Sequence, residues 1–217
     1  MNTWIDASCI LNVLFALMIM STYRIAGMIR LYAGQTLILS FVPLFLHADS
    51  IGGHELFLSL GTMILKAAIV PFVLFWAIRH ISMRSEVRPI IGAGASIIAA
   101  AFLIAGAFWM SLSLKLPGSL STGLIVPCSL ATILLGFMIM VTRTRAVTQV
   151  VGYLVIENGI FLFALSLYDA MPTLIEMGIL LDIFVAVFIM AIVLNHINEE
   201  FEHNQPGSGL SKMGETF

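Results

Sequence analysis

Charged residues are scarce in this sequence. Only 10% of its 217 residues are Asp, Glu, Lys or Arg, and 60% are hydrophobic. A soluble globular domain carries about 25% charged residues, and a soluble fold of this size keeps too much of its surface in water to hide so many apolar side chains. The composition therefore excludes a soluble domain and predicts an integral membrane protein.

Several kinds of site are also missing from the sequence. Cys9 and Cys128 are far apart in apolar segments and lack the clustered spacing of a zinc or iron–sulfur site. The glycines of IIGAGAS (90–96) are not followed by Gly-Lys-Ser/Thr, and no basic run indicates a nucleic acid partner. Because no Ser/His/Asp or Cys/His set is found either, we expect a chain that is not catalytic alone and holds no metal or cofactor.

Long apolar stretches fill most of the chain. A helix needs about 20 mostly apolar residues to cross the hydrocarbon core of a bilayer, and seven stretches meet this length. They run near 4–22, 31–47, 55–78, 90–113, 123–141, 147–168 and 173–195. The sequence thus predicts an all-α polytopic membrane protein with about seven transmembrane helices, followed by a mobile polar tail at 199–217.

Basic residues gather in alternate loops, and this bias indicates the orientation. The first, third and fifth loops, with the residues flanking them, carry Arg24, Arg30, Arg79, Arg84, Arg88, Arg143 and Arg145. The opposite loops carry Lys115 as their one Lys or Arg, together with His47, Asp49, His54, Glu55 and Asp169. Since cytoplasmic loops are enriched in Lys and Arg, we expect the N-terminus outside and the C-terminus in the cytoplasm.

The span near 90–113 contains small residues at four-residue intervals. Gly92, Ser96 and Ala100 form one series, and Ala95 and Ala99 form another. Small residues at this spacing let two helix backbones approach closely. We therefore expect this helix to pack tightly against a neighbour.

Ionisable residues inside the predicted spans are the strongest functional signal. Lys66, Glu157 and Asp182 lie well inside spans, and Glu176 lies one to two turns before Asp182. Desolvation disfavours the charged form of such groups, so they can exchange protons near neutral pH. Because intramembrane ionisable residues usually mark ion or proton pathways, we interpret these four as parts of such a path. The alternative for any one of them is a structural polar contact.

A weak internal repeat relates the two ends of the chain. FWAIRHI (75–81) aligns with AIVLNHI (191–197), which places Lys66 on Asp182, and a slightly larger offset places Gln35 on Glu157. This predicts a parallel repeat of two three-helix units. The expected organisation is an N-terminal unit at 1–82, a linking helix at 83–118 and a second unit at 119–198.

The last three spans resemble the K subunit of bacterial complex I and the C subunit of multisubunit cation/proton antiporters. Glu157 and Asp182 match the two acids of those proteins, with Asp where the second is more often Glu. The whole chain except the tail, with LKAAIVPFVL (65–74), YLVIENGIF (153–161) and GILLDIFVAVFIMAIV (178–193), resembles hydrogenase-4 component E. That family is the membrane subunit of formate-hydrogenlyase-like complexes.

The resemblance implies a subunit of a membrane-bound oxidoreductase complex in a bacterial or archaeal cytoplasmic (inner) membrane. Its partners would be antiporter-like and anchor subunits of the membrane arm and a soluble hydrogenase arm. Nickel–iron and iron–sulfur centres would lie in those partners, and this chain would contribute buried charges to proton or ion translocation. The alternatives are a subunit of a cation/proton antiporter or related ion-translocating complex, and a purely structural assembly subunit.

Overall fold

The computed structural model describes residues 2–46, 63–80, 92–114 and 123–167, together with positions 177, 178, 184 and 187. All of the elements in this part of the chain are helices, which confirms the all-α fold class. They are α1 (Asn2–Ser21), α2 (Ile25–Leu46), η1 (Met63–Ile69), α4 (Val70–His80), α5 (Ala93–Ser113), α6 (Ile125–Thr142) and α7 (Ala146–Ser166). Apart from these four positions, the last predicted span lies outside the described residues, and so does the tail.

Five of these helices, α1, α2, α5, α6 and α7, are long and apolar enough to cross a membrane. A shorter apolar helix runs from Lys66 to Trp76, within η1 and α4. The count of seven spans and the three-helix repeat stay predictions. The observed bounds of α6 and α7 nevertheless lie within two residues of the predicted spans 123–141 and 147–168.

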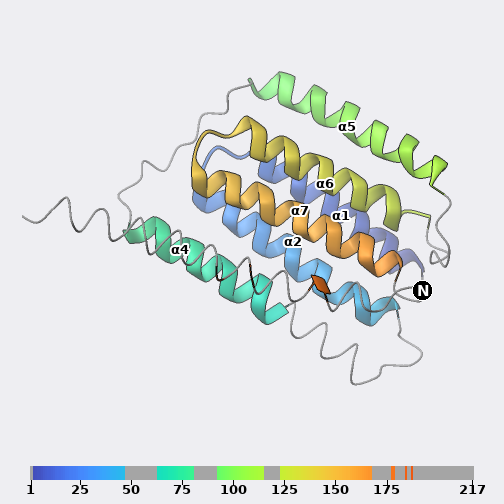
Figure 1. Ribbon diagram of the computed structural model, residues 1–217, viewed down its shortest axis with the longest axis horizontal. Helices are drawn as coiled ribbons and strands as arrows, with labels where there is room; N and C mark the ends of the chain where they lie inside the picture. The colour runs from blue at the N-terminus through green and yellow to red at the C-terminus, as the bar shows by residue number, and fades with distance from the viewer. Residues whose placement is uncertain are drawn as a thin grey trace, which may run out of the picture.

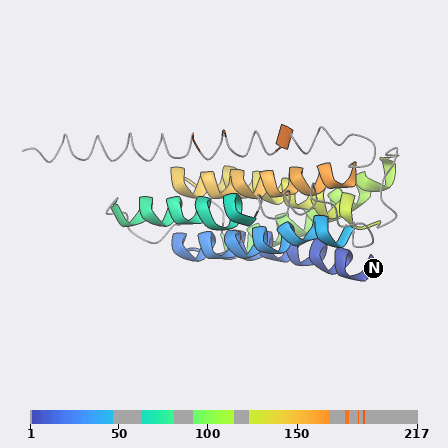
Figure 2. The ribbon, with the colours of Figure 1, turned by 90° about the horizontal axis from the view of Figure 1, so that it is seen from below.

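Four helices form the centre of the molecule, with α5 at one edge and α4 at the other (Figure 1). They make two antiparallel hairpins, α1–α2 and α6–α7, each closed by a three-residue loop at 22–24 or 143–145. In the turned view α7 and the α1–α2 hairpin occupy different levels (Figure 2). Because α1 contacts α6 and α2 contacts α7, the hairpins stack on one another and enclose a common interior.

Glycines bring α6 and α7 into backbone contact. A Cβ added at Gly152 would lie 2.8 Å from the backbone nitrogen of Met140, and one at Gly159 would lie 2.9 Å from that of Ile133. Gly136 meets α7 in the same way. A side chain at any of these positions would therefore push the two helices apart.

The small residues of α5 meet the expectation of tight packing only in part. Ser96 and Ala100 are buried, so one of the two series does face the bundle. A Cβ added at Gly94 or Gly106, however, would meet no atom of the described residues within 4 Å. The closest helix approach in the described chain thus uses glycines of α6 and α7 rather than the stripe on α5.

Candidate functional site

Lys66 and Glu157 are both buried in the helical bundle. Glu157 of α7 is 5% exposed and Lys66 of η1 is 2% exposed. The Lys66 ammonium lies 5.5 Å from the centroid of the Phe161 ring, within range of a cation–π attraction. Since Phe161 follows Glu157 by four residues, the two side chains share one face of α7. The structure therefore brings Lys66 to the face of α7 that bears Glu157.

The local backbone around Lys66 is unusual. Residues Met63–Ile69 form a π-helix that continues directly into α4. Pro71 follows at the start of α4, and a proline cannot donate to the carbonyl four residues before it, which favours a departure from α-helical bonding here. Such π segments are rare and are often found at functional sites.

A hydrogen-bonded polar network crosses all four central helices. Thr132 Oγ1 of α6 and Gln35 Nε2 of α2 each donate to Asn12 Oδ1 of α1, both at 3.1 Å. Asn158 Nδ2 of α7 donates to Gln35 Oε1 at 3.3 Å and to Thr36 Oγ1 at 3.0 Å. All five side chains are at most 1% exposed. We call this set, Asn12, Gln35, Thr36, Thr132 and Asn158, the amide network.

The amide network lies near the middle of its helices, where a bilayer is most apolar. Each hydrogen bond between the two hairpins joins residues at similar heights along their helices, because α1 runs parallel to α6 and α2 runs parallel to α7. Asn12 Nδ2 and Asn158 Oδ1 have no hydrogen-bond partner among the described residues. Leaving a buried polar group unpaired costs about 1–3 kcal/mol, so the hydrogen bonds that the network does make matter to the stability of the bundle.

Arg143 forms a second buried polar contact, at the C-terminal end of α1. Its side chain is 1% exposed, and Nη2 donates to the carbonyls of Met20 and, at 3.1 Å, Thr22. A cation at this position compensates the carbonyl end of a helix. Burial lowers the pKa of the Arg143 guanidinium, and the neighbouring Tyr23 opposes that shift. Arg143 thus joins the ends of the two hairpins rather than facing solvent.

The predicted site residues fall into two groups. Lys66 and Glu157 are buried and meet the same face of α7, whereas Asp182 and Glu176 lie outside the described residues. Within the described part of the chain, no group of three His, Cys, Asp or Glu is placed to hold a metal ion.

Sequence reasoning missed most of the amide network. Gln35 was singled out only as the repeat counterpart of Glu157, and Arg143 only as a loop charge. Asn12 in ILNVLF and Asn158 in VIENGIF are the signals that could have been used. An amide within an apolar run usually faces the bundle interior, because hydrocarbon offers it no hydrogen bond.

Comparisons with known proteins find relatives that match most of the chain at low identity. Hydrogenase-4 component E of Escherichia coli K12 is 28% identical over 168 residues, which cover 76% of this chain and 77% of that protein. The protein of the same name from Shigella flexneri matches equally. An uncharacterized protein of Mycobacterium tuberculosis is 26% identical over 193 residues, covering 87% of this chain and 86% of its own. No family model and no solved structure matches. The chain is a homologue of hydrogenase-4 component E.

Proposed function

We propose that this protein is a membrane subunit of a hydrogenase complex and that its buried charges form part of a proton or ion path. The observation that carries the proposal is the burial of Glu157 of α7 and of Lys66, which lies against the Phe161 ring on the same face of α7, in a chain homologous to a hydrogenase component. Asp182 and Glu176 would extend the path in the C-terminal part of the chain.

The energetics favour a functional role for these two residues. Placing one charged side chain at the centre of a membrane helix costs about 2.5–3.5 kcal/mol even on insertion scales. A packing role could be filled by apolar side chains of similar volume at no such cost. Ionisable groups kept inside a membrane span at such a cost usually mark an ion or proton path.

The redox chemistry of such a complex would belong to its other subunits. Nickel–iron and iron–sulfur centres would sit in a soluble arm, while antiporter-like and anchor subunits would adjoin this chain in the membrane. This protein would supply none of the catalytic residues. Its contribution would be to link the membrane path to the redox reaction.

The test is Glu157→Gln in the purified complex reconstituted into vesicles. Gln is nearly isosteric and still hydrogen-bonds, so the complex should assemble. Coupled proton movement should fall at least about tenfold, because a carboxamide does not titrate. Hydrogenase activity with artificial electron acceptors should stay close to that of the unaltered complex.

Asp6→Asn is the matched control, since it removes an acid from α1, a different transmembrane helix, and should leave coupled proton movement near its original rate. Coupled movement at the full rate in Glu157→Gln would contradict a proton-carrying role. Copurification with a set of antiporter subunits and no nickel or iron–sulfur protein would favour the alternative ion-transport complex.

A further inference from the structure

Asn158 is the residue next to Glu157, and it is fixed from outside its own helix. Its Nδ2 atom donates to Gln35 Oε1 and Thr36 Oγ1, both on α2. Gln35 is in turn held by Asn12, through the backbone carbonyl and through Oδ1, each at 3.1 Å. Hydrogen bonds therefore link Asn158 to α2 and, through Gln35, to α1. Helix α7 cannot move Asn158 without breaking these bonds.

These bonds fix how α7 is rotated about its axis. Neighbouring residues of an α-helix point about 100° apart, and side chains extend roughly 5–6 Å from the axis. When Asn158 is held toward α2, Glu157 is held in a different, defined direction, and Phe161 is held beneath Lys66. A rotation of about 20° would move the Glu157 carboxyl by about 2 Å. That is enough to break a direct hydrogen bond, which needs a separation of about 2.6–3.2 Å.

The network itself is poorly suited to carry protons. Its members are carboxamides and hydroxyls, and a carboxamide has fixed donors on nitrogen and a fixed acceptor on oxygen. A charge arriving at Gln35 or Asn158 would find no group that titrates. The same set of bonds can therefore orient a neighbouring acid without itself relaying a proton through its carboxamides.

We propose that the amide network is the positioning device for Glu157, acting through Asn158 and Thr36, and that it carries no proton. This inference rests on the proposed function for its biological meaning. Its structural content, that bonds from α2 determine where the Glu157 carboxyl points, can be tested separately.

The simpler alternative is that these bonds only hold the helices together. Interhelical hydrogen bonds in membrane proteins contribute about 0.6 kcal/mol on average, so a purely adhesive role is physically reasonable. It predicts that losing one hydroxyl lowers stability slightly and leaves Glu157 unaffected. The two ideas therefore differ in what happens to the Glu157 carboxyl.

The chain offers a matched pair of substitutions. Thr36 and Thr142 are both buried, and each hydroxyl donates to the carbonyl four residues earlier, at 3.0 Å to Tyr32 and 2.7 Å to Met138. Only Thr36 also accepts from Asn158. Thr36→Val and Thr142→Val thus remove the same hydroxyl and the same local bond, and they differ in the link to α7.

The measurement is the infrared carboxyl band of Glu157 in the complete purified complex, identified as the band that Glu157→Gln removes. Thr36→Val and Asn158→Ala should displace this band and reduce coupled proton movement by about tenfold or more, since misplacing a reacting group by about 1 Å can cost about 100-fold. Thr36→Ser should restore the band because it returns the acceptor hydroxyl. Thr142→Val should leave the band in place.

An unchanged band in assembled Thr36→Val complex would overturn the proposal, and so would an equal displacement in Thr142→Val. If Asn158→Ala fails to assemble, the Thr36 and Thr142 variants decide. The band reports the surroundings of Glu157 whether or not that residue carries protons. Full proton movement in Glu157→Gln would therefore reject the proposed function, while the band would still accept or reject the positioning role.

Discussion

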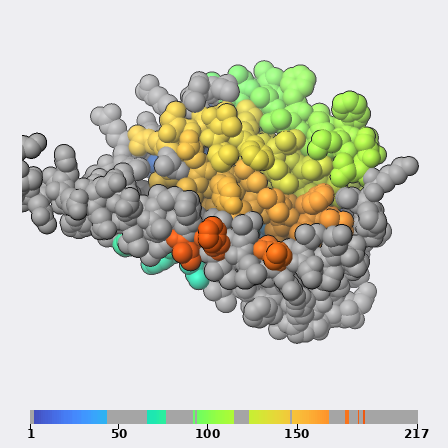
Figure 3. All heavy atoms as spheres, viewed as in Figure 1, coloured from blue at the N-terminus to red at the C-terminus, as the bar shows by residue number. Residues whose placement is uncertain are grey.

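Helices α5 and α7 are equally long, with 21 residues each, yet they occupy opposite environments. In the most apolar stretch of α5, 17% of the residues are buried, whereas in that of α7 67% are buried. Figure 3 shows α5 side chains along one edge of this face, beside those of α6. Both helices satisfy the same length and hydropathy criteria for a membrane span. Hydropathy thus identifies a span without telling whether lipid or protein surrounds it.

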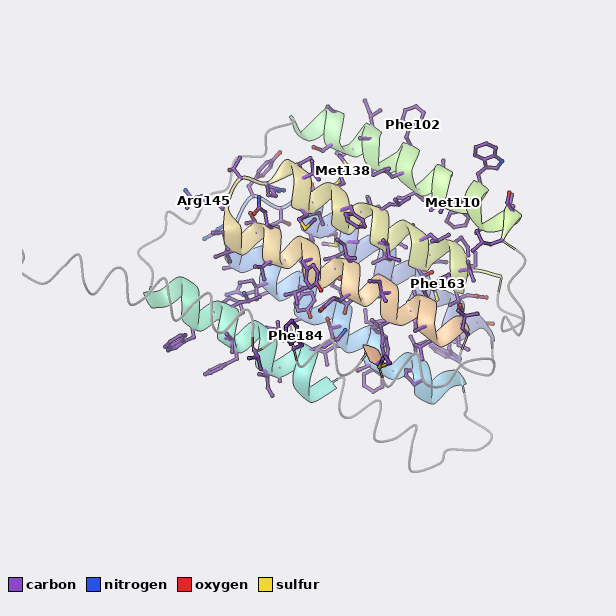
Figure 4. The ribbon with its side chains drawn as sticks, viewed as in Figure 1. Phe102, Met110, Met138, Arg145, Phe163 and Phe184 are labelled. Carbon is purple, nitrogen blue, oxygen red and sulfur yellow. The ribbon has the colours of Figure 1, made fainter. Side chains whose placement is uncertain are left out.

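The difference lies in how polar residues are distributed. Helix α5 has no charged residue and exposes Phe102, Trp109 and Leu112, and Phe102 projects away from the bundle (Figure 4). Lipid tails are as apolar as these side chains, so their exposure costs little in a membrane. Helix α7 carries Glu157 and Asn158, which lipid would leave unsolvated. The charge and the amide, rather than the apolar residues, therefore select the helix that is enclosed.

Glycine substitutions should show the largest difference in stability between α7 and α5. Gly152→Leu places a side chain where Met140 backbone atoms already lie within 3.1 Å, so α6 and α7 must separate. We expect a loss of about 3 kcal/mol or more in stability, above the usual cost of overpacking a core, and little folded chain in the membrane. Thermal unfolding of detergent-purified protein would measure this.

Gly94→Leu is the matched substitution on α5. A Cβ there meets no atom of the described residues within 4 Å, so the change in unfolding temperature should be close to zero. Equal destabilisation by the two variants would show that α5 is packed as tightly as α7, and the contrast between the helices would then be wrong.

Gln35→Leu should have an intermediate effect, because Gln35 is the member of the amide network that links α1 to α7. Its loss leaves Asn12 Oδ1 with the Thr132 bond alone and Asn158 Nδ2 with the Thr36 bond alone. We expect a loss of about 1–3 kcal/mol in stability. Ser111→Ala on α5 removes an exposed hydroxyl that bonds only within its own helix, and it should change stability by less than about 0.5 kcal/mol. Equal unfolding temperatures would show that the network is energetically neutral.

The sequence predicted the helices well and their contacts less well. Apolar runs longer than a bilayer is thick can hardly be anything but helices, and the bounds of α6 and α7 followed from them. Lys66 and Glu157 lie inside predicted spans, and the structure adds that both side chains are buried. The pairing of Asn12 with Gln35 and Thr132 depends on the rotation of three helices, which periodicity cannot supply when nearly all residues are apolar.

The same limit applies to two features of the sequence whose packing depends on how the helices are arranged. Small residues every four positions predicted tight packing for the span near 90–113, but such a stripe shows only that close approach is possible. The glycines that achieve it, Gly136, Gly152 and Gly159, are recognised only once α6 and α7 are antiparallel neighbours. Arg143 was counted as a loop charge, and only the stacking of the two hairpins shows that it is enclosed.

Phe161→Leu should give the smallest effect, and it compares one buried aromatic ring of α7 with one exposed ring of α5. Phe161 is 4% exposed beneath Lys66, whereas Phe102 on α5 is 75% exposed. Leu keeps most of the apolar volume but has no aromatic face to attract the ammonium, a contact that contributes about 0.5–2 kcal/mol. We expect a loss of about 1–2 kcal/mol in stability from the missing attraction and the small cavity together.

Coupled proton movement should also fall a few-fold in Phe161→Leu, because Lys66 would be held less firmly against α7. Phe102→Leu makes the same chemical change at an exposed position of α5 and should leave both quantities within error, as judged by unfolding temperature and proton uptake by vesicles. If Phe161→Leu matched Phe102→Leu in both measurements, the ring would be a spacer, and Lys66 would depend on other neighbours for its position.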